Sequence, residues 1–232
     1  MNKIMAVSAS SVLSCIRFPG SSDFNIQKLI NVLVPYRRMH YAYPSYAPFL
    51  SKFDKQDHNY SLRDIVKSVI DEDNNLGYCD PKIATNPDIR NISLSTCFQF
   101  RGEVEPSEVV QCLDSIYPNL KFPTDIPRGM NSTIINEPCI DFEDILAPKT
   151  AVHMLDVSGR VYDNFQMIWD EFDRTYRTRA YAHCLVGEGL EEGEIIDSRE
   201  DMAATTKDYE SVSLRYYNYW ESNGEGEEES FW

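Results

Sequence analysis

The side chains best suited to metal binding or nucleophilic catalysis are six cysteines and four histidines, and both sets are scattered along the chain. They are Cys15, Cys79, Cys97, Cys112, Cys139 and Cys184, with His40, His58, His153 and His183. The cysteines form no C-x-x-C pair, and no histidine accompanies a nucleophile motif such as G-x-S-x-G. We therefore expect reduced, mostly buried thiols. A zinc site assembled from residues far apart in the chain is the alternative.

A second candidate chemistry is the negative charge of the last quarter of the chain. Residues 188–232 hold eleven Glu and three Asp against Arg199, Lys207 and Arg215, so they carry −11 of the total formal charge of −15. Their carboxylates are candidate partner-binding residues: Glu188, Glu191, Glu192, Glu194, Glu200, Asp201, Asp208, Glu225, Glu227, Glu228 and Glu229. A solvated charge run is the plainer alternative. Because nucleic acids and anionic membranes are bound through clustered Lys and Arg, we expect basic proteins as partners, with no nucleic acid and no membrane.

Phosphate-binding patterns are missing from the sequence. It has no P-loop and no Rossmann glycine pattern, so no glycine-rich turn can offer backbone N–H groups to phosphates. It also has no apolar segment of the length that spans a bilayer, and its first residues lack the apolar run of a signal peptide. We therefore expect a cytosolic protein.

The elements that must position these residues begin with four helices. An apolar, Ser-rich stretch over residues 1–16 suits the end of a buried helix. The spacing of apolar residues over 23–33 predicts a second helix, with Asp23 as its N-cap. Residues 61–70, capped by Ser61, and residues 105–116 are predicted to be helices as well.

Strands are predicted between these helices. The aromatic-rich stretch 39–50 favours a strand followed by an irregular loop, since it contains Pro44 and Pro48. Residues 92–101 alternate as a buried strand does, residues 151–155 form another, and 120–122 and 133–135 are weaker candidates. Strands interleaved with helices predict an α+β fold, a mixed sheet flanked by helices.

The character of the chain changes after residue 158. The repeat of Val161, Phe165, Ile168, Phe172 and Tyr176 predicts an amphipathic helix of about five turns, with a polar face that carries Asp163, Asp170, Glu171 and Arg174. The glycine-glutamate run 187–194 then separates it from a helix over about 197–209. These two helices are expected to form a hairpin, followed by a disordered acidic tail.

Together these segments resemble α-tubulin over essentially the whole chain. The matching residues are Met1-Asn2-Lys3-Ile4-Met5, Ser14-Cys15-Ile16-Arg17-Phe18-Pro19-Gly20, Val34-Pro35-Tyr36, Tyr46-Ala47-Pro48, Cys79-Asp80-Pro81, Arg101-Gly102, Gly187 to Glu194 and Arg199 to Ala204. The long loop 136–150 is similar to that of α-tubulins, whereas the sequence of residues 17–20 is nearer to that of β-tubulins. The chain is identified as a divergent relative of the α-tubulins.

The resemblance implies a domain order. Residues 1–16 would be the remnant of the long central helix, 17–158 an intermediate-like domain with the mixed sheet, 159–212 the C-terminal helical hairpin, and 213–232 an acidic and aromatic tail. The nucleotide-binding domain of the family would lie before Met1. Because apolar side chains of residues 1–16 would then be half uncovered, we expect the isolated chain to be marginally stable or prone to aggregate.

The resemblance also bears on catalysis. α-Tubulins use an acidic residue to position the water that attacks GTP in the neighbouring β subunit, and the matching position here is Lys28. The companion acidic position is Asn25, so no catalytic residue is expected, and Asp23 is interpreted as a helix cap. Asn2 matches the guanine-contacting Asn of the family. GTP and Mg²⁺ are the cofactors of the full-length family, and none is expected on this chain alone.

The partners implied by the resemblance are β-tubulin or tubulin dimers, together with motors and basic microtubule-associated proteins, in the cytoplasm and cytoskeleton. The main hypothesis is a structural constituent of microtubules. One alternative is a module that binds tubulin or motors without polymerising, and another is a fragment of a full-length GTP-binding tubulin. A GTPase activity of the chain itself is the hypothesis that Lys28 and Asn25 disfavour.

Overall fold

The computed structural model describes residues 2–18, 20, 25–51, 60–71, 74–77, 90, 92–120, 122, 129–139 and 145–224. The chain divides into two compact units. One unit comprises Met1–Tyr78 with Ser93–Val157, and the other comprises Cys79–Ile92 with Ser158–Trp232.

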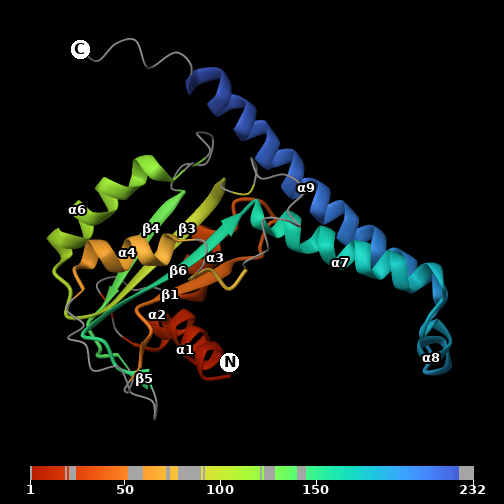
Figure 1. Cartoon of the computed structure of the whole chain (residues 1–232), viewed down its shortest axis with the longest axis horizontal. Helices are drawn as coiled ribbons and strands as arrows, with labels where there is room; N and C mark the ends of the chain where they lie inside the picture. Colours follow the sequence, from red (N-terminus) through yellow and green to blue (C-terminus); the bar gives the residue numbers. More distant parts are fainter. Residues whose placement is uncertain are drawn as a thin grey trace. The chain divides into compact units, whose positions relative to one another are not determined.

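The first unit is built on a four-stranded sheet with the strand order β1-β6-β3-β4 (Figure 1). The strands are β1 (Tyr43–Ala47), β3 (Ser93–Gly102), β4 (Met130–Ile135) and β6 (Thr150–Ser158). β1 runs antiparallel to β6, and β3 runs parallel to β4, so the sheet is mixed. A separate two-stranded sheet pairs β2 (Leu50–Ser51) with β5 (Ile145–Leu146).

One face of the large sheet is covered by α4 (Leu62–Ile70) and α6 (Pro106–Ile116), which is followed by the short 3-10 helix η2 (Tyr117–Asn119). The core between them is apolar: its sheet residues include Phe98, Phe100 and Val152, none of which is exposed. Ser61 caps α4 as predicted, because its hydroxyl oxygen accepts a hydrogen bond from the Asp64 N–H at 3.2 Å.

The other face carries α1 (Asn2–Val12), α2 (Ser14–Arg17) and α3 (Ile26–Leu33), which contact β1, β4 and β3 respectively. The helix predicted over 1–16 is therefore broken by a turn at Leu13. Ile4, Met5 and Leu13 are exposed, as the sequence led us to expect of this segment, whereas Val7 is buried. Aggregation of the isolated chain stays a prediction.

The layer beneath α1 and α2 is more polar than the layer beneath α4 and α6. The Ser14 hydroxyl lies 3.5 Å from the Gln99 side-chain oxygen, and the Gln99 amide nitrogen lies 3.4 Å from Cys15 Sγ. His153 on β6 is buried, and neither of its ring nitrogens has a hydrogen-bond partner among the described residues. Burial lowers the pKa of His153 to about 3, so the imidazole is neutral in the folded chain.

The predicted α+β class is confirmed, and so are the strands over 92–101, 133–135 and 151–155 and the helix over 105–116. The weak strand candidate at 120–122 is wrong where the structure describes it. Leu120 and Phe122 form a tight turn instead, with the Phe122 N–H donating to the Leu120 carbonyl at 3.1 Å. Lys121 lies outside the described residues.

The second unit is helical, with α7 (Arg160–Arg177), α8 (Ala182–Gly187) and α9 (Glu192–Gly224). α7 and α9 pack side by side (Figure 1). α9 is much longer than the helix predicted over 197–209, and it includes residues 213–224 that were assigned to the tail. The reason is that no Pro or Gly interrupts residues 194–223, and buried side chains recur at helical spacing, at Tyr209, Ser213 and Tyr216.

The predicted faces of α7 are partly wrong. Ile168, placed on the apolar stripe, is 50% exposed, and Asp163, placed on the polar face, is buried. Trp169 is half-buried in place of Ile168. A helix-period pattern fixes the mean direction of the apolar face, but which flanking residues it includes depends on the packing partner.

Candidate functional surfaces

Asn25 and Lys28, which stand where the resemblance implies two acidic residues, lie together at the start of α3. Asn25 has an extended backbone, and its side-chain oxygen accepts the Lys28 N–H at 2.8 Å. Asn25, and not Asp23, is therefore the N-cap of α3, and Asp23 lies outside the described residues. Asn is as good a cap as Asp, since both present a side-chain oxygen to an unpaired helix N–H.

The chemical character of this turn is cationic. Lys28 is exposed, and the described first turn of α3 contains no acidic residue. A lysine ammonium offers three donors and no acceptor, so it cannot orient a water molecule as a carboxylate does. Asn2 is the first residue of α1, and its side chain lies outside what the structure describes. A guanine contact by Asn2 stays a prediction.

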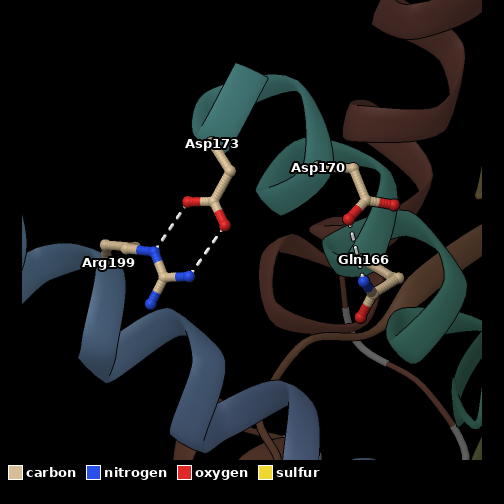
Figure 2. A network of polar contacts seen from close by, with 4 residues as sticks. All are labelled: Gln166, Asp170, Asp173 and Arg199. Atoms are coloured by element: carbon tan, nitrogen blue, oxygen red, sulfur yellow. Dashed lines mark hydrogen bonds and ion pairs between the residues drawn. The ribbon is translucent and has the colours of Figure 1, made fainter. Parts of the chain in front are cut away.

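A bidentate ion pair joins α7 and α9, the two long helices of the second unit. Arg199 Nε and Nη2 each donate to one carboxylate oxygen of Asp173 at 2.7 Å (Figure 2). The guanidinium carbon also lies 5.0 Å from the centroid of the Trp169 ring, a cation–π contact. The hydrogen bonds from Arg199 lower the pKa of the Asp173 carboxyl, and the same bonds raise the pKa of Arg199.

A second polar contact joins the end of α7 to the start of α9. Glu192 forms an ion pair with Arg179 and accepts a hydrogen bond from the Tyr176 hydroxyl at 3.3 Å. Arg179 and Tyr181 have positive φ angles of 52° and 64°, so the chain makes a left-handed turn between α7 and α8. Non-glycine residues rarely adopt that conformation.

α9 begins with a side-chain cap, in which the third residue of the helix bonds back to the residue before the helix. The Glu191 N–H donates to the Glu194 carboxylate at 3.0 Å. A carboxylate in the first turn also faces the positive end of the helix dipole. Two of the acidic residues predicted to bind partners, Glu192 and Glu194, thus have a structural role within the hairpin.

The remaining predicted acidic residues fall into three groups. Glu188, Glu191, Glu200 and Asp201 are exposed, and we call these four the acidic face. Asp208 is half-buried. Glu225, Glu227, Glu228 and Glu229 lie outside the described residues, so their part in binding stays a prediction.

Sequence reasoning missed the residues that hold the hairpin together, Trp169, Asp173 and Arg199. The four-residue spacing of Trp169 and Asp173 places them one turn apart, which is visible in the sequence. Their partner Arg199 is 26 residues beyond Asp173, and nothing in the sequence pairs residues at that separation.

Neither a metal-binding cluster nor a membrane-spanning helix is found among the described residues. Within those ranges, no three potential His, Cys, Asp or Glu ligands gather in one place. No described helix has both the length and the hydrophobicity to cross a membrane. Gln166 donates a hydrogen bond to Asp170, one turn further along α7, at 3.1 Å (Figure 2).

Comparison with known proteins gives similarity over the whole chain. Residues 37–170 match the model of the tubulin C-terminal domain. The chain is 30% identical over 237 residues to the tubulin alpha chain of Dictyostelium discoideum, an alignment that covers 100% of this chain and 49% of that relative. It is 32% identical over 216 residues to the tubulin alpha-1 chain of Arabidopsis thaliana, which covers 91% and 46%. The chain thus spans about half the length of the curated relatives it matches.

Proposed function

This chain belongs to the tubulin family, and from that premise we propose that it is an α-tubulin-like cytoskeletal protein and a structural constituent of microtubules. The observation that carries the proposal is the match to α-tubulin chains over 91–100% of this sequence. The proposed partners are β-tubulin or tubulin dimers, and the proposed location is the cytoplasm.

Incorporation into microtubules is tested by copolymerisation. The full chain is mixed with purified tubulin dimers and GTP, and the polymer is pelleted. A structural constituent pellets in proportion to the tubulin polymer and is released when the polymer is depolymerised by cold. Binding to tubulin dimers that never enters the pellet would overturn this proposal in favour of the non-polymerising module.

The first turn of α3 supports that second candidate. Where the resemblance implies a pair of carboxylates, this chain has Asn25, whose side-chain oxygen is engaged as a cap, and the exposed cation Lys28. We propose that the chain can contact a nucleotide-bearing partner without promoting hydrolysis there, because it supplies no acceptor for the attacking water. This would make it an assembly regulator.

Measurement of phosphate release tests whether Asn25 and Lys28 prevent GTP hydrolysis in the partner. The full chain is combined with GTP-loaded tubulin dimers, and the double variant Asn25→Asp with Lys28→Glu is compared with it. We expect the double variant to raise the GTP hydrolysis rate, and the variant Asn31→Asp, in the last turn of α3, to leave it unchanged. If the unmodified chain accelerates hydrolysis as much as the double variant does, Lys28 and Asn25 do not block catalysis.

We propose separately that the chain by itself does not bind GTP. GTP and Mg²⁺ would need charge-compensating donors and oxygen ligands, and the one predicted contact on this chain is Asn2. We expect a fluorescent GTP analogue titrated with the full chain to show no saturable binding. Saturable binding that Asn2→Ala abolishes would revive a GTP-binding role.

The acidic face is proposed to receive motors and other basic microtubule-binding proteins. Glu200 and Asp201 lie on α9, Glu188 and Glu191 precede it in the chain, and the ion pair between Asp173 and Arg199 joins α9 to α7. Attraction between exposed charges of opposite sign steers association and weakens as salt rises.

A matched pair of variants tests this surface with a purified kinesin motor domain as the probe. Glu200→Gln with Asp201→Asn removes two charges from the acidic face. Glu105→Gln with Glu108→Gln removes two exposed charges from the start of α6. We expect the first pair to raise the Kd about three- to tenfold in dilute salt and the second pair to change it less than about twofold. Equal effects would mean that only total charge matters.

A further inference from the structure

The described cysteines differ in their surroundings, and one stands apart. Cys15, Cys97 and Cys112 are buried, Cys139 is half-buried, and Cys184 in α8 is exposed. Burial raises the pKa of the Cys15, Cys112 and Cys139 thiols, and it raises the pKa of Cys97 to about 12. Because the thiolate is the reactive form of cysteine, these four are poor nucleophiles in the folded chain.

Cys184 also has an imidazole beside its sulfur. Its Sγ lies 3.3 Å from Nε2 of His183, and both side chains are exposed. When Nδ1 carries the ring proton, Nε2 accepts the thiol proton. A base in contact with a thiol is the arrangement that activates a cysteine as a nucleophile. The pair therefore combines access with a route for the proton.

One carboxylate, that of Glu188, lies a helical turn from Cys184. The Glu188 N–H donates to the Cys184 carbonyl oxygen at 3.2 Å, so the two residues are one helical turn apart, and side chains at this spacing share a face. Glu188 is exposed. A carboxylate next to a nucleophile raises the local concentration of cations and lowers that of anions.

We propose that Cys184 is a site of covalent modification that reacts with small cationic disulfides by thiol–disulfide exchange, with His183 as the proton acceptor. The thiol proton moves to Nε2 as the sulfur attacks one sulfur of the reagent. A new S–S bond joins Cys184 to half of the reagent while the S–S bond of the reagent breaks. The released thiolate then takes the proton from the imidazolium, so the reagent is itself the oxidant and no other co-reactant is needed.

The site is tested on the full chain with cystamine, a dication, and with glutathione disulfide, an anion. Peptide mass mapping locates the first addition. We expect it at Cys184, with loss of the fast addition in Cys184→Ala and reaction of Cys15, Cys97 and Cys112 only in urea. A first addition at any of the buried cysteines, or at Cys79, which lies outside the described residues, would overturn the proposal.

The role of His183 is tested by His183→Gln. An ordinary thiol is only a few per cent ionised near neutral pH, so loss of the proton acceptor should slow the cystamine reaction about three- to tenfold. Because both side chains are exposed, the unfolding midpoint should stay the same. A variant that reacts as fast as the unmodified chain would remove His183 from the proposal.

The preference for cations is tested by Glu188→Gln. We expect the ratio of the cystamine rate to the glutathione disulfide rate to fall about two- to fivefold, and the control Glu108→Gln in α6 to leave that ratio unchanged. High salt should reduce the ratio in the unmodified chain and abolish the difference from Glu188→Gln. A ratio that Glu188→Gln does not change would overturn the cationic selectivity.

Discussion

The sheet core of the first unit is held together by burial of apolar side chains, whereas the hairpin of the second unit adds an exposed ion pair to the buried side chains of α7 and α9. Phe98, Phe100 and Val152 are fully buried beneath α4 and α6, so this layer depends on removal of apolar surface from water. In the hairpin, the Asp173 and Arg199 side chains that join α7 to α9 are 39% and 31% exposed. Ion pairs at such exposure contribute little each and are screened by salt. The core should therefore respond to changes of side-chain volume, and the contact between Asp173 and Arg199 should respond to ionic strength.

The largest effect is expected from Phe98→Ala, which empties a fully buried site in β3. Loss of the ring and the cavity that remains should lower the free energy of unfolding by about 3–5 kcal/mol, a large part of the stability of an ordinary domain. Urea unfolding followed by circular dichroism measures it. Val110→Ala on α6, where the side chain is 58% exposed, should cost less than about 0.5 kcal/mol. Similar losses at the two sites would contradict the burial argument.

The next largest effect is expected at low pH, from protonation of the buried His153. Burial lowers its pKa from the usual 6.5 to about 3, so the unfolded chain binds a proton at a pH where the folded chain does not. The stability contributed by neutral His153 is present above pH 6.5 and is lost as pH falls towards 3. Each pKa unit corresponds to about 1.4 kcal/mol, so the loss between pH 6.5 and pH 4 should reach about 3.5 kcal/mol.

Unfolding midpoints at a series of pH values measure this dependence. His153→Phe should flatten the profile between about pH 6.5 and pH 4, whereas His40→Gln, which changes an exposed ring, should not. An unchanged slope in His153→Phe would assign the acid sensitivity to other groups.

The sequence predicted most of this fold because its signals are local. The spacing of Leu62, Ile65, Val66 and Val69 and the cap at Ser61 define α4 without any knowledge of the sheet. The pairing of β3 with β4, the partner of Asp173 and the burial of His153 depend on residues far apart in the chain, so no local pattern contains them.

The candidate surfaces were likewise predictable in their local features but not in their long-range contacts. Their composition, a run of carboxylates and a lysine in place of an acid, could be predicted from the sequence. Their geometry could not, because whether a carboxylate caps a helix, pairs with Arg179 or faces solvent depends on the packing of α7 against α9. Asn25 shows this limit of sequence-based prediction most clearly. The helix cap is two residues from the predicted Asp23, so a different side chain accepts the helix N–H.

Two glycine substitutions, one in each unit, should change the stability by an intermediate amount. Gly102 at the end of β3 has a φ angle of +102°, and a Cβ there would meet the Lys149 carbonyl. Gly102→Ala should therefore cost about 1–3 kcal/mol. Gly193 in the first turn of α9 has nothing within 4 Å of its Cβ position, so Gly193→Ala should be neutral or stabilise by up to about 1 kcal/mol. Thermal unfolding compares them, and the same sign for both would contradict the packing described.

The smallest effect is expected from the ion pair itself. Arg199→Ala removes both hydrogen bonds to Asp173 and the contact with Trp169, so amides of α9 should exchange with solvent about two- to fivefold faster in dilute salt. In about 0.5 M NaCl the difference should shrink, because the pair is already screened. Arg174→Ala, whose partner Glu171 is more exposed than Asp173, should leave exchange unchanged. A salt-independent effect of Arg199→Ala would mean that stacking on Trp169, and not charge, holds α9 on α7. The hairpin would then resemble the sheet core in the interactions that stabilise it.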